Sequence, residues 1–201
     1  MFLLLDVVSP IPEFHLIDDK KIRDSVHILN NVDEKLSDKL VSTYLNINNS
    51  YKLYKNIKKL IITIGPGSYT ALRVGASFIA GLSQSMDLPV AVISTETIYN
   101  HIIESGYKKG IYFESSNKQI FFSYKKETEF IHEKVDNQNY SIPNSISLIF
   151  YNNSLPSFIN SKISLQNFSI MKSVIQNLHR LEFNKNKIIR PIHVSNNIIL
   201  N

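Results

Sequence analysis

The residue types that most often do chemistry in proteins are thinly spread along this chain. Its six histidines are His15, His27, His101, His132, His179 and His193. No two of them are four residues apart, the spacing that lets one helix bind zinc, and the chain has no cysteine. We therefore expect no metal site, and we interpret each histidine as an isolated surface residue or a satisfied polar one.

Asp6 is the carboxylate best placed for catalysis, because it ends an apolar run that begins at Phe2 and predicts a buried strand. The turn that follows, residues 9–12, has the sequence Ser-Pro-Ile-Pro. Two prolines in four residues leave few backbone N–H groups to hold a phosphate. Glu96 is better explained as an acidic residue in the first turn of a helix than as a general base. We expect no catalytic residue in this chain.

Glycine is rare in this sequence and is concentrated in one place. Four of the six glycines lie between positions 65 and 81, at Gly65, Gly67, Gly75 and Gly81. Such a concentration indicates backbone that needs a positive φ or a close approach. A strand followed by the turn Gly65-Pro66-Gly67-Ser68 and then by a helix is also an arrangement that can bind phosphate at the helix N-terminus. In that arrangement Ser68 would be the N-cap and Thr70 a further donor. The alternative, which we favour, is a tight corner that needs glycine for its geometry alone.

The helix predicted after this turn, residues 69–86, carries more apolar surface than one sheet can cover. Apolar residues occupy an arc of roughly 260°, whereas a helix on a sheet needs a stripe only somewhat over 100° wide. Arg73, Ser77 and Gln84 mark the only clearly polar side. Either the second half of the chain or another protein is expected to bury the excess.

These residues are positioned by elements that alternate along the chain. We predict strands at residues 2–8, 14–17, 25–29, 60–64, 89–93, 111–113, 119–124, 129–135 and 146–151. We predict helices at residues 33–47, 69–86, 94–104 and 171–183, the first with Asp33 as its N-cap. This order favours an α/β protein whose mixed sheet is covered by helices. A boundary near residues 106–110 divides the chain into lobes 1–105 and 106–201. Residues 136–144 are the predicted mobile loop. The apolar tail, residues 188–194 and 198–200, is expected to dock back onto the body of the protein.

Composition is that of a globular protein. The chain has 201 residues, of which 43% are hydrophobic and 19% charged, and a net charge of +5. No apolar run reaches the 18 residues of a membrane span, and the N-terminal stretch lacks the features of a signal peptide, so we expect a cytoplasmic protein. The lysines are dispersed in short pairs, which favours solvated faces over a dedicated nucleic-acid patch.

Two neighbouring stretches are far more specific than a glycine turn. Residues 64–75 read IGPGSYTALRVG, and residues 88–96 read LPVAVISTE. Together they resemble the signature of the TsaB (YeaZ) family, a GPGS-aromatic-T-G-LR-hydrophobic-G block followed by a strand that ends in Ser-Thr or Ser-Ser. Ala71 stands where the family usually has glycine, and Val7-Val8 follow Asp6 where it usually has Thr-Ser.

The resemblance implies a two-lobed fold of the actin/Hsp70/sugar-kinase type, which is ribonuclease H-like, with a smaller, degenerate C-terminal lobe. It implies a non-catalytic bacterial subunit that pairs with a catalytic paralogue, TsaD, and with an ATPase, TsaE. Together these place a threonylcarbamoyl group on the adenosine beside the tRNA anticodon. The family docks its paralogue through two N-terminal helices, here residues 33–47 and 69–86.

From this resemblance we predict which residues bind the partner: Leu36, Leu40, Tyr44, Ala71, Val74, Gly75, Phe78 and Leu82. The glycine-rich turn comprises Gly65, Gly67, Ser68, Thr70 and Arg73. We expect no cofactor in this chain alone, and any ATP or ADP at the junction with partner subunits. tRNA contact is expected to be indirect, through the complex, and a homodimer to form in isolation. The alternatives are an active ATP-binding or peptidase-like enzyme of the same fold, and direct tRNA binding by the scattered lysines.

Overall fold

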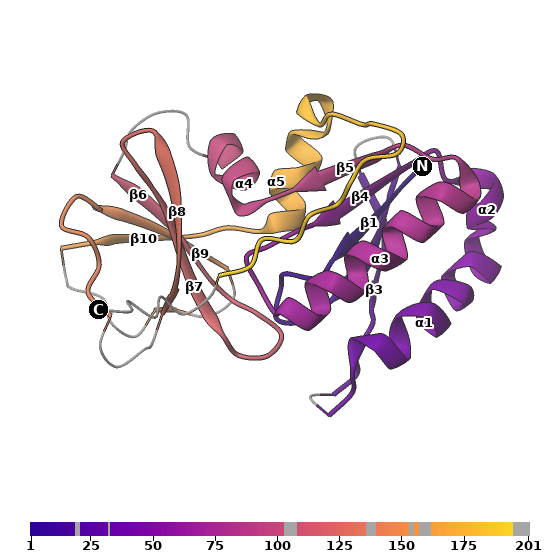
Figure 1. Ribbon diagram of the computed structural model, residues 1–201, viewed down its shortest axis with the longest axis horizontal. Helices are drawn as coiled ribbons and strands as arrows, with labels where there is room; N and C mark the ends of the chain where they lie inside the picture. The colour runs from indigo at the N-terminus through magenta and orange to yellow at the C-terminus, as the bar shows by residue number, and fades with distance from the viewer. Residues whose placement is uncertain are drawn as a thin grey trace.

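The computed structural model describes residues 1–18, 21–31, 33–102, 108–135, 140–152, 155–156 and 162–194. The strands form two five-stranded sheets, which lie side by side with helices packed around the first (Figure 1).

The first sheet is mixed and has the order β3-β2-β1-β4-β5. Its strands are β1 (Phe2–Asp6), β2 (Glu13–Asp18), β3 (Lys21–His27), β4 (Lys59–Thr63) and β5 (Val90–Ile93). β1, β4 and β5 pair in parallel, whereas β2 pairs antiparallel with both β1 and β3. The central strands β1 and β4 are buried almost throughout, which is why they read as continuous apolar runs rather than as alternating patterns.

Helices cover both faces of this sheet. They are α1 (Leu36–Tyr51), α2 (Leu53–Asn56), α3 (Tyr69–Met86), α4 (Thr95–Ile102) and α5 (Ile170–Gln176), followed by a 3₁₀ turn at Leu178–Arg180. Helices α1 and α3 lie on one side, and α4 and α5 lie on the other, toward the second sheet (Figure 1). The predicted bounds of α3 are confirmed, because its apolar pattern begins directly after the glycine turn and ends at Asp87, in the left-handed conformation.

The second sheet has the order β10-β9-β6-β7-β8. Its strands are β6 (Lys109–Glu114), β7 (Ile120–Lys126), β8 (Glu129–Val135), β9 (Leu148–Asn152) and β10 (Ser164–Asn167). β6, β7 and β8 form an antiparallel meander, and β9 and β10 add in parallel. β10, whose four residues are all exposed, was not predicted, because an exposed edge strand leaves no apolar pattern.

The C-terminal segment returns to the first sheet. Asn184 forms a bridge with Val90 of β5, and the backbone N–H of Ile192 donates to the carbonyl of Ile64 over 2.8 Å. Ile192 therefore lies beside the end of β4, where the glycine turn begins, and Ile188, Ile189 and Pro191 line a pocket with α3. The predicted tail at 198–200, residues 136–139 of the predicted loop and residues 106–107 of the predicted boundary lie outside the described residues.

The start of α1 differs from the prediction. Asp33 lies in a turn before the helix, and Lys35 takes the N-cap position without a side-chain hydrogen bond. The carboxylate of Glu34 accepts a hydrogen bond from the N–H of Asn30 and pairs with Lys39, which holds the loop outside the helix. The helix also continues past the predicted end to Tyr51, because the N–H of Lys52 closes it on the carbonyl of Asn48.

Helix α5 is shorter than the predicted helix 171–183. It ends at Gln176, because Asn177 leaves the helical region of φ and ψ and its side-chain amide donates to the carbonyl of Ser173. The chain then makes only the 3₁₀ turn before extending.

Burial sets the protonation of His132 in β8. Its Nδ1 lies 2.8 Å from the hydroxyl of the fully buried Ser123, and burial lowers the pKa of the imidazole from 6.5 to about 4. Between these pH values the unfolded chain binds more protons than the folded one, so stability rises with pH.

We expect acidification from pH 6.5 to 4 to lower the free energy of unfolding through His132 by up to about 3 kcal/mol. The His132→Asn variant, which keeps a polar partner for Ser123, should show a shallower fall, measured by urea unfolding across this range. Some slope should persist, because burial also lowers the pKa of His101. An unchanged slope in the variant would contradict this assignment.

Candidate functional site

The glycine-rich turn is a junction of four segments. Gly65 has a φ of +105°, and a Cβ there would lie 2.9 Å from Leu72 of α3 and 3.1 Å from the carbonyl oxygen of Ile192. The carbonyl of Gly65 accepts hydrogen bonds from both the N–H and the hydroxyl of Thr95, at the start of α4. Glycine at this position therefore lets β4, α3, α4 and the C-terminal segment meet.

The other clustered glycines differ in what they do. A Cβ on Gly75 would lie 2.9 Å from a methyl group of the fully buried Val7, so glycine there lets α3 approach the segment that follows β1 closely. A Cβ on Gly67 would make only ordinary contacts, and one on Gly81 would meet nothing within 4 Å. The requirement for positive φ or close approach thus holds at Gly65 and Gly75 and not at the other two.

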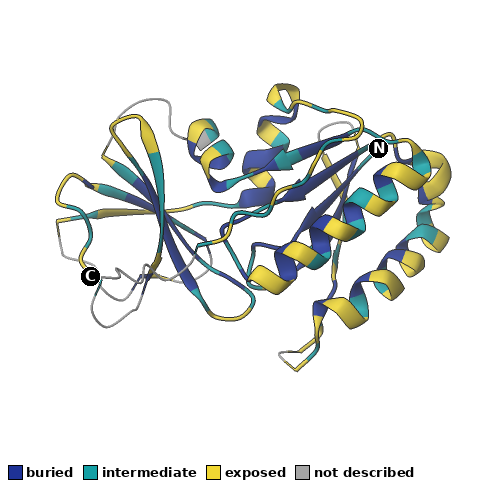
Figure 2. Ribbon diagram, in the orientation of Figure 1, coloured by how far each residue is buried: buried dark blue, intermediate teal, exposed yellow. Residues whose placement is uncertain are grey.

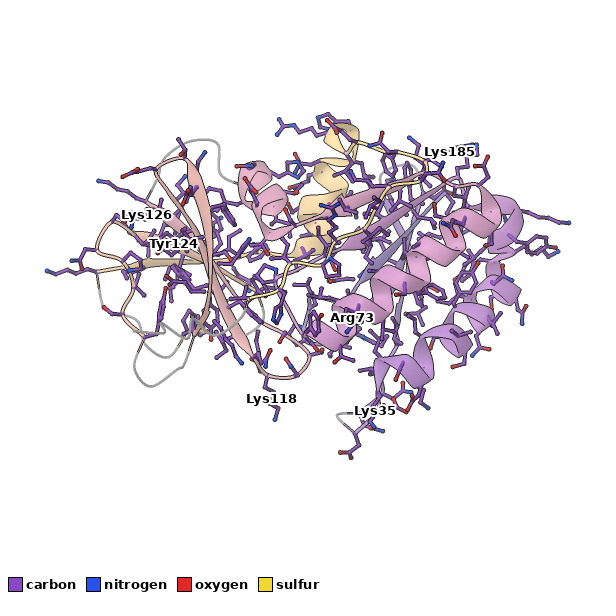
Figure 3. The ribbon with its side chains drawn as sticks, in the orientation of Figure 1. Lys35, Arg73, Lys118, Tyr124, Lys126 and Lys185 are labelled. Carbon is purple, nitrogen blue, oxygen red and sulfur yellow. The ribbon has the colours of Figure 1, made fainter. Side chains whose placement is uncertain are left out.

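The polar residues of the turn line the beginning of α3. Ser68 is at the N-cap position as predicted, but its side chain makes no capping hydrogen bond. Thr70 is exposed on the first turn of the helix. The guanidinium of Arg73 lies 5.2 Å from the ring centre of Tyr69, and Figure 3 shows Arg73 near this end of α3.

Asp6, the carboxylate that the sequence places best for catalysis, is held in a network of hydrogen bonds. It is buried, and it accepts from the N–H groups of Val8 and Ser9 and from the hydroxyls of Ser9 and Thr63. Thr63 in turn accepts from the N–H of Val7. The N–H groups of Val8 and Ser9, which this turn could otherwise offer a phosphate, are thus already engaged by Asp6.

Two of the histidines share one carboxylate. His15 Nε2 lies 3.1 Å from one carboxylate oxygen of Glu13, and His27 Nδ1 lies 2.6 Å from the other. A hydrogen bond from His15, with further contributions from His27, lowers the pKa of Glu13. The alternation Glu-Phe-His along β2 could have indicated that Glu13 and His15 share one face of the strand. The position of His27 opposite Glu13 depends on the register of the β2–β3 hairpin, which the sequence does not give. In the described part of the chain, no three histidine, aspartate or glutamate residues are arranged to hold a metal ion.

The eight residues predicted to bind a partner are largely internal. Leu36, Leu40, Tyr44, Ala71 and Gly75 are buried, and Val74, Phe78 and Leu82 are half-buried. The ring of Phe78 packs edge-on against Tyr44 of α1 and Phe14 of β2, with centroids 5.3 and 6.0 Å apart. Much of the wide apolar arc of α3 is therefore covered by α1, a contact that the pattern of α3 alone could not reveal.

What remains open on this side is a groove between α1 and α3. Its volume is about 580 Å³, and its walls include Leu40, Val41, Val74 and Phe78. Beside it, Val41 and Leu45 on the outer stripe of α1 are 52% and 50% exposed. Figure 2 shows this outer face of α1 as largely exposed. The prediction omitted both residues, although their spacing of four marks a second apolar stripe on α1.

Comparison with known proteins identifies the family of this chain. The profile of the family described as TsaD, tRNA N6-adenosine threonylcarbamoyltransferase, matches residues 33–152, more than half of the chain. The chain belongs to the TsaD family. It is thus a member of a tRNA modification family, and the matched span contains both α1 and α3, as well as the glycine turn.

Two solved structures share the fold over nearly the whole chain. YeaZ from Pseudomonas aeruginosa is 11% identical, with a TM-score of 0.64, and the alignment covers 96% of this chain and 99% of that one. An uncharacterized protein with similarity to peptidase YeaZ, from the same organism, is 12% identical, with a TM-score of 0.62 and the same coverage. With the TsaD family match, they confirm the resemblance to the TsaB (YeaZ) family and the two-lobed α/β fold. No curated protein matches the sequence.

Among the helices that the structure describes, none is both long enough and apolar enough to cross a membrane.

Proposed function

We propose that this chain is a non-catalytic subunit of the machinery that places a threonylcarbamoyl group on the adenosine beside the tRNA anticodon. In this proposal it binds a catalytic TsaD-like paralogue, and an ATPase of the TsaE type completes the complex. tRNA is contacted through the complex, and any ATP or ADP binds at the junction between subunits.

The observation that carries the proposal is the apolar surface of α1 beside the α1–α3 groove. Val41 and Leu45 lie one helical turn apart and leave half of their surfaces in water, next to a groove with apolar walls. Exposed apolar side chains that adjoin a groove are typical of sites that bind another protein. The resemblance to the TsaB family implies docking through these same two helices.

The environment of Asp6 favours a binding role for this chain over a catalytic one. Its carboxylate is buried, accepts three hydrogen bonds from the β1–β2 turn and accepts a fourth from Thr63 of β4. A catalytic carboxylate needs a lone pair that can reach substrate, and a nucleotide site in this turn needs free N–H groups. The backbone N–H groups of Val8 and Ser9 in this turn are taken up by Asp6 itself.

The test is co-purification with the catalytic paralogue from the same organism. We expect Val41→Glu and Leu45→Glu each to weaken the complex by at least about 30-fold, because a carboxylate would be desolvated in an apolar interface. Affinity can be measured by calorimetry and stoichiometry by light scattering. Phe78 is unsuitable for this test, because a charge there would disrupt its contacts with Phe14 and Tyr44.

The matched control is Leu165→Glu on β10, an exposed leucine in the second sheet, remote from α1 (Figure 1). It should bind as the wild type does. A functional measurement completes the test: the modified nucleoside in tRNA should be lost on deletion of the gene and restored by Leu165→Glu but not by Leu45→Glu. Equal binding by all three variants would contradict the proposed surface. If Val41→Glu and Leu45→Glu abolish only a homodimer, the surface pairs two copies instead.

A further inference from the structure

Helix α3 lies between two grooves, and one positive charge lies on the wall of both. The α1–α3 groove of the proposed docking surface borders one flank of the helix. A second groove, of about 440 Å³, borders the other flank, where part of the C-terminal segment forms its opposite wall. Arg73 and Ser77 line both grooves, and both residues are exposed. Arg73 therefore lies on the ridge that separates them.

Arg73 has no carboxylate partner in the described part of the chain. None of the ion pairs found there includes it, and no aspartate or glutamate among the described residues lines either groove. Helix α3 itself contains no acidic residue. Asp38, the acidic residue of α1, does not line the groove, and its carboxylate accepts a hydrogen bond from the hydroxyl of Ser37. The charge of Arg73 in the docking groove is thus uncompensated.

Aromatic contacts restrict the side chain of Arg73 before any partner binds. Its guanidinium lies 5.2 Å from the ring centre of Tyr69, and His193 packs against the same ring, with centroids 4.6 Å apart. The hydrogen bond from Ile192 to Ile64 fixes the chain beside His193. Because the arginine is already restricted in the free protein, less side-chain entropy is lost when it pairs with a group on another molecule.

On the basis of the proposed function, we propose that Arg73 determines partner choice at the docking surface by pairing with a carboxylate of the catalytic paralogue. The partner then presents apolar side chains to the groove and one acidic side chain to the ridge. A guanidinium binds a carboxylate through two parallel hydrogen bonds, which fix the orientation of the partner as well as its charge. A protein with a neutral or basic side chain at that place would leave the guanidinium unpaired and would bind more weakly.

The test measures the affinity of the full chain for the catalytic paralogue from the same organism, by calorimetry at low and high salt. Arg73→Gln should weaken the complex about tenfold, and its remaining affinity should depend less on salt than that of the wild type. Arg73→Glu should weaken it about a hundredfold, because two carboxylates would then face each other. Arg73→Lys keeps the charge but not the two parallel hydrogen bonds, so its affinity should lie between those of the wild type and Arg73→Gln.

The matched control is Lys126→Gln, which removes one positive charge from β7, far from α3 (Figure 3). It should leave both the affinity and its salt dependence as in the wild type, and an unchanged melting temperature checks the folding of every variant.

The acidic residue of the partner can be identified by chemistry. In the complex with Arg73→Lys, a zero-length carbodiimide reagent should couple the introduced amine to the carboxylate in contact with it, and mass spectrometry locates the new amide bond. Replacing that partner residue by lysine should then restore the binding of Arg73→Glu, because opposite charges face each other again.

Leu45→Glu, measured in parallel, separates this inference from the proposed function. Equal affinity of Arg73→Gln and the wild type, beside a loss of affinity in Leu45→Glu, would overturn the role of Arg73 and leave the docking surface in place. Equal affinity of all the variants, Leu45→Glu included, would mean that the docking surface itself is wrong. A coupling product formed only between two copies of this chain would place the carboxylate in a homodimer and would also overturn the inference.

Discussion

Replacing Asp6 with alanine is expected to lower the free energy of unfolding by about 3–5 kcal/mol, measured by denaturant titration. The substitution removes the acceptor of four hydrogen bonds and leaves the donors of Val8, Ser9 and Thr63 unpaired around a buried site. Such a loss is a large fraction of the stability of a domain of this size.

Two companion variants separate this effect from a loss of charge. Asp6→Asn keeps the oxygen that accepts from Val8 and Thr63, so it should cost only about 1–2 kcal/mol. Asp18→Ala removes a half-exposed carboxylate whose ion pairs are 3.8–3.9 Å long, and it should change stability by less than about 0.5 kcal/mol. An Asp6→Ala protein as stable as the wild type would show that the network is not structural.

Opposite effects are expected when alanine replaces two glycines of the same helix. Gly75→Ala should destabilise the protein by about 1–3 kcal/mol, because its Cβ would lie 2.9 Å from a methyl group of Val7, which is fully buried and cannot move aside. Gly81→Ala should stabilise it by about 0.5–1 kcal/mol, because the new methyl group meets nothing and alanine favours the helix.

Thermal and denaturant unfolding of both variants provide the measurement, with helix content by circular dichroism to show that α3 is retained. Because the same chemical change is made six residues apart in one helix, helix propensity is common to both variants. The two positions differ in what the new methyl group meets, Val7 at Gly75 and nothing at Gly81. Equal shifts in the two proteins would mean that α3 does not approach the sheet as closely as the structure has it.

The strands and helices around the glycine turn could be predicted because their signals are local. The β4 strand is a run of apolar, mostly β-branched residues, and α3 begins at the turn and ends where its apolar pattern stops. The first turn of α1 was misplaced, because two local contacts of Glu34 compete with capping by Asp33. A single sequence does not show which residue begins the helix, since Asp33 and Glu34 are both of a type that is common before helices.

The sequence predicted which two helices form the candidate surface, but not which of their residues are exposed on it. The excess apolar arc of α3 was visible in the sequence, but which surface covers it depends on where α1 lies. Tyr44 and Phe78 are far apart in the chain and meet only after the first sheet has brought α1 alongside α3. Packing against α1 and the first sheet buries five of the predicted partner residues and leaves the outer stripe, with Val41 and Leu45, to face water.

The sequence by itself determined the family signature, the glycine-rich turn and the extent of α3, because each depends on neighbours within a few residues. Only the tertiary structure decided what these features do. It showed that Gly65 and Gly75 serve close packing, whereas Gly67 and Ser68 open onto a pocket shared with Asn117, Lys134 and His193. The physical reason is that burial and pocket geometry are set by segments far apart in the chain, whose meeting depends on strand register and helix packing rather than on local residue preference.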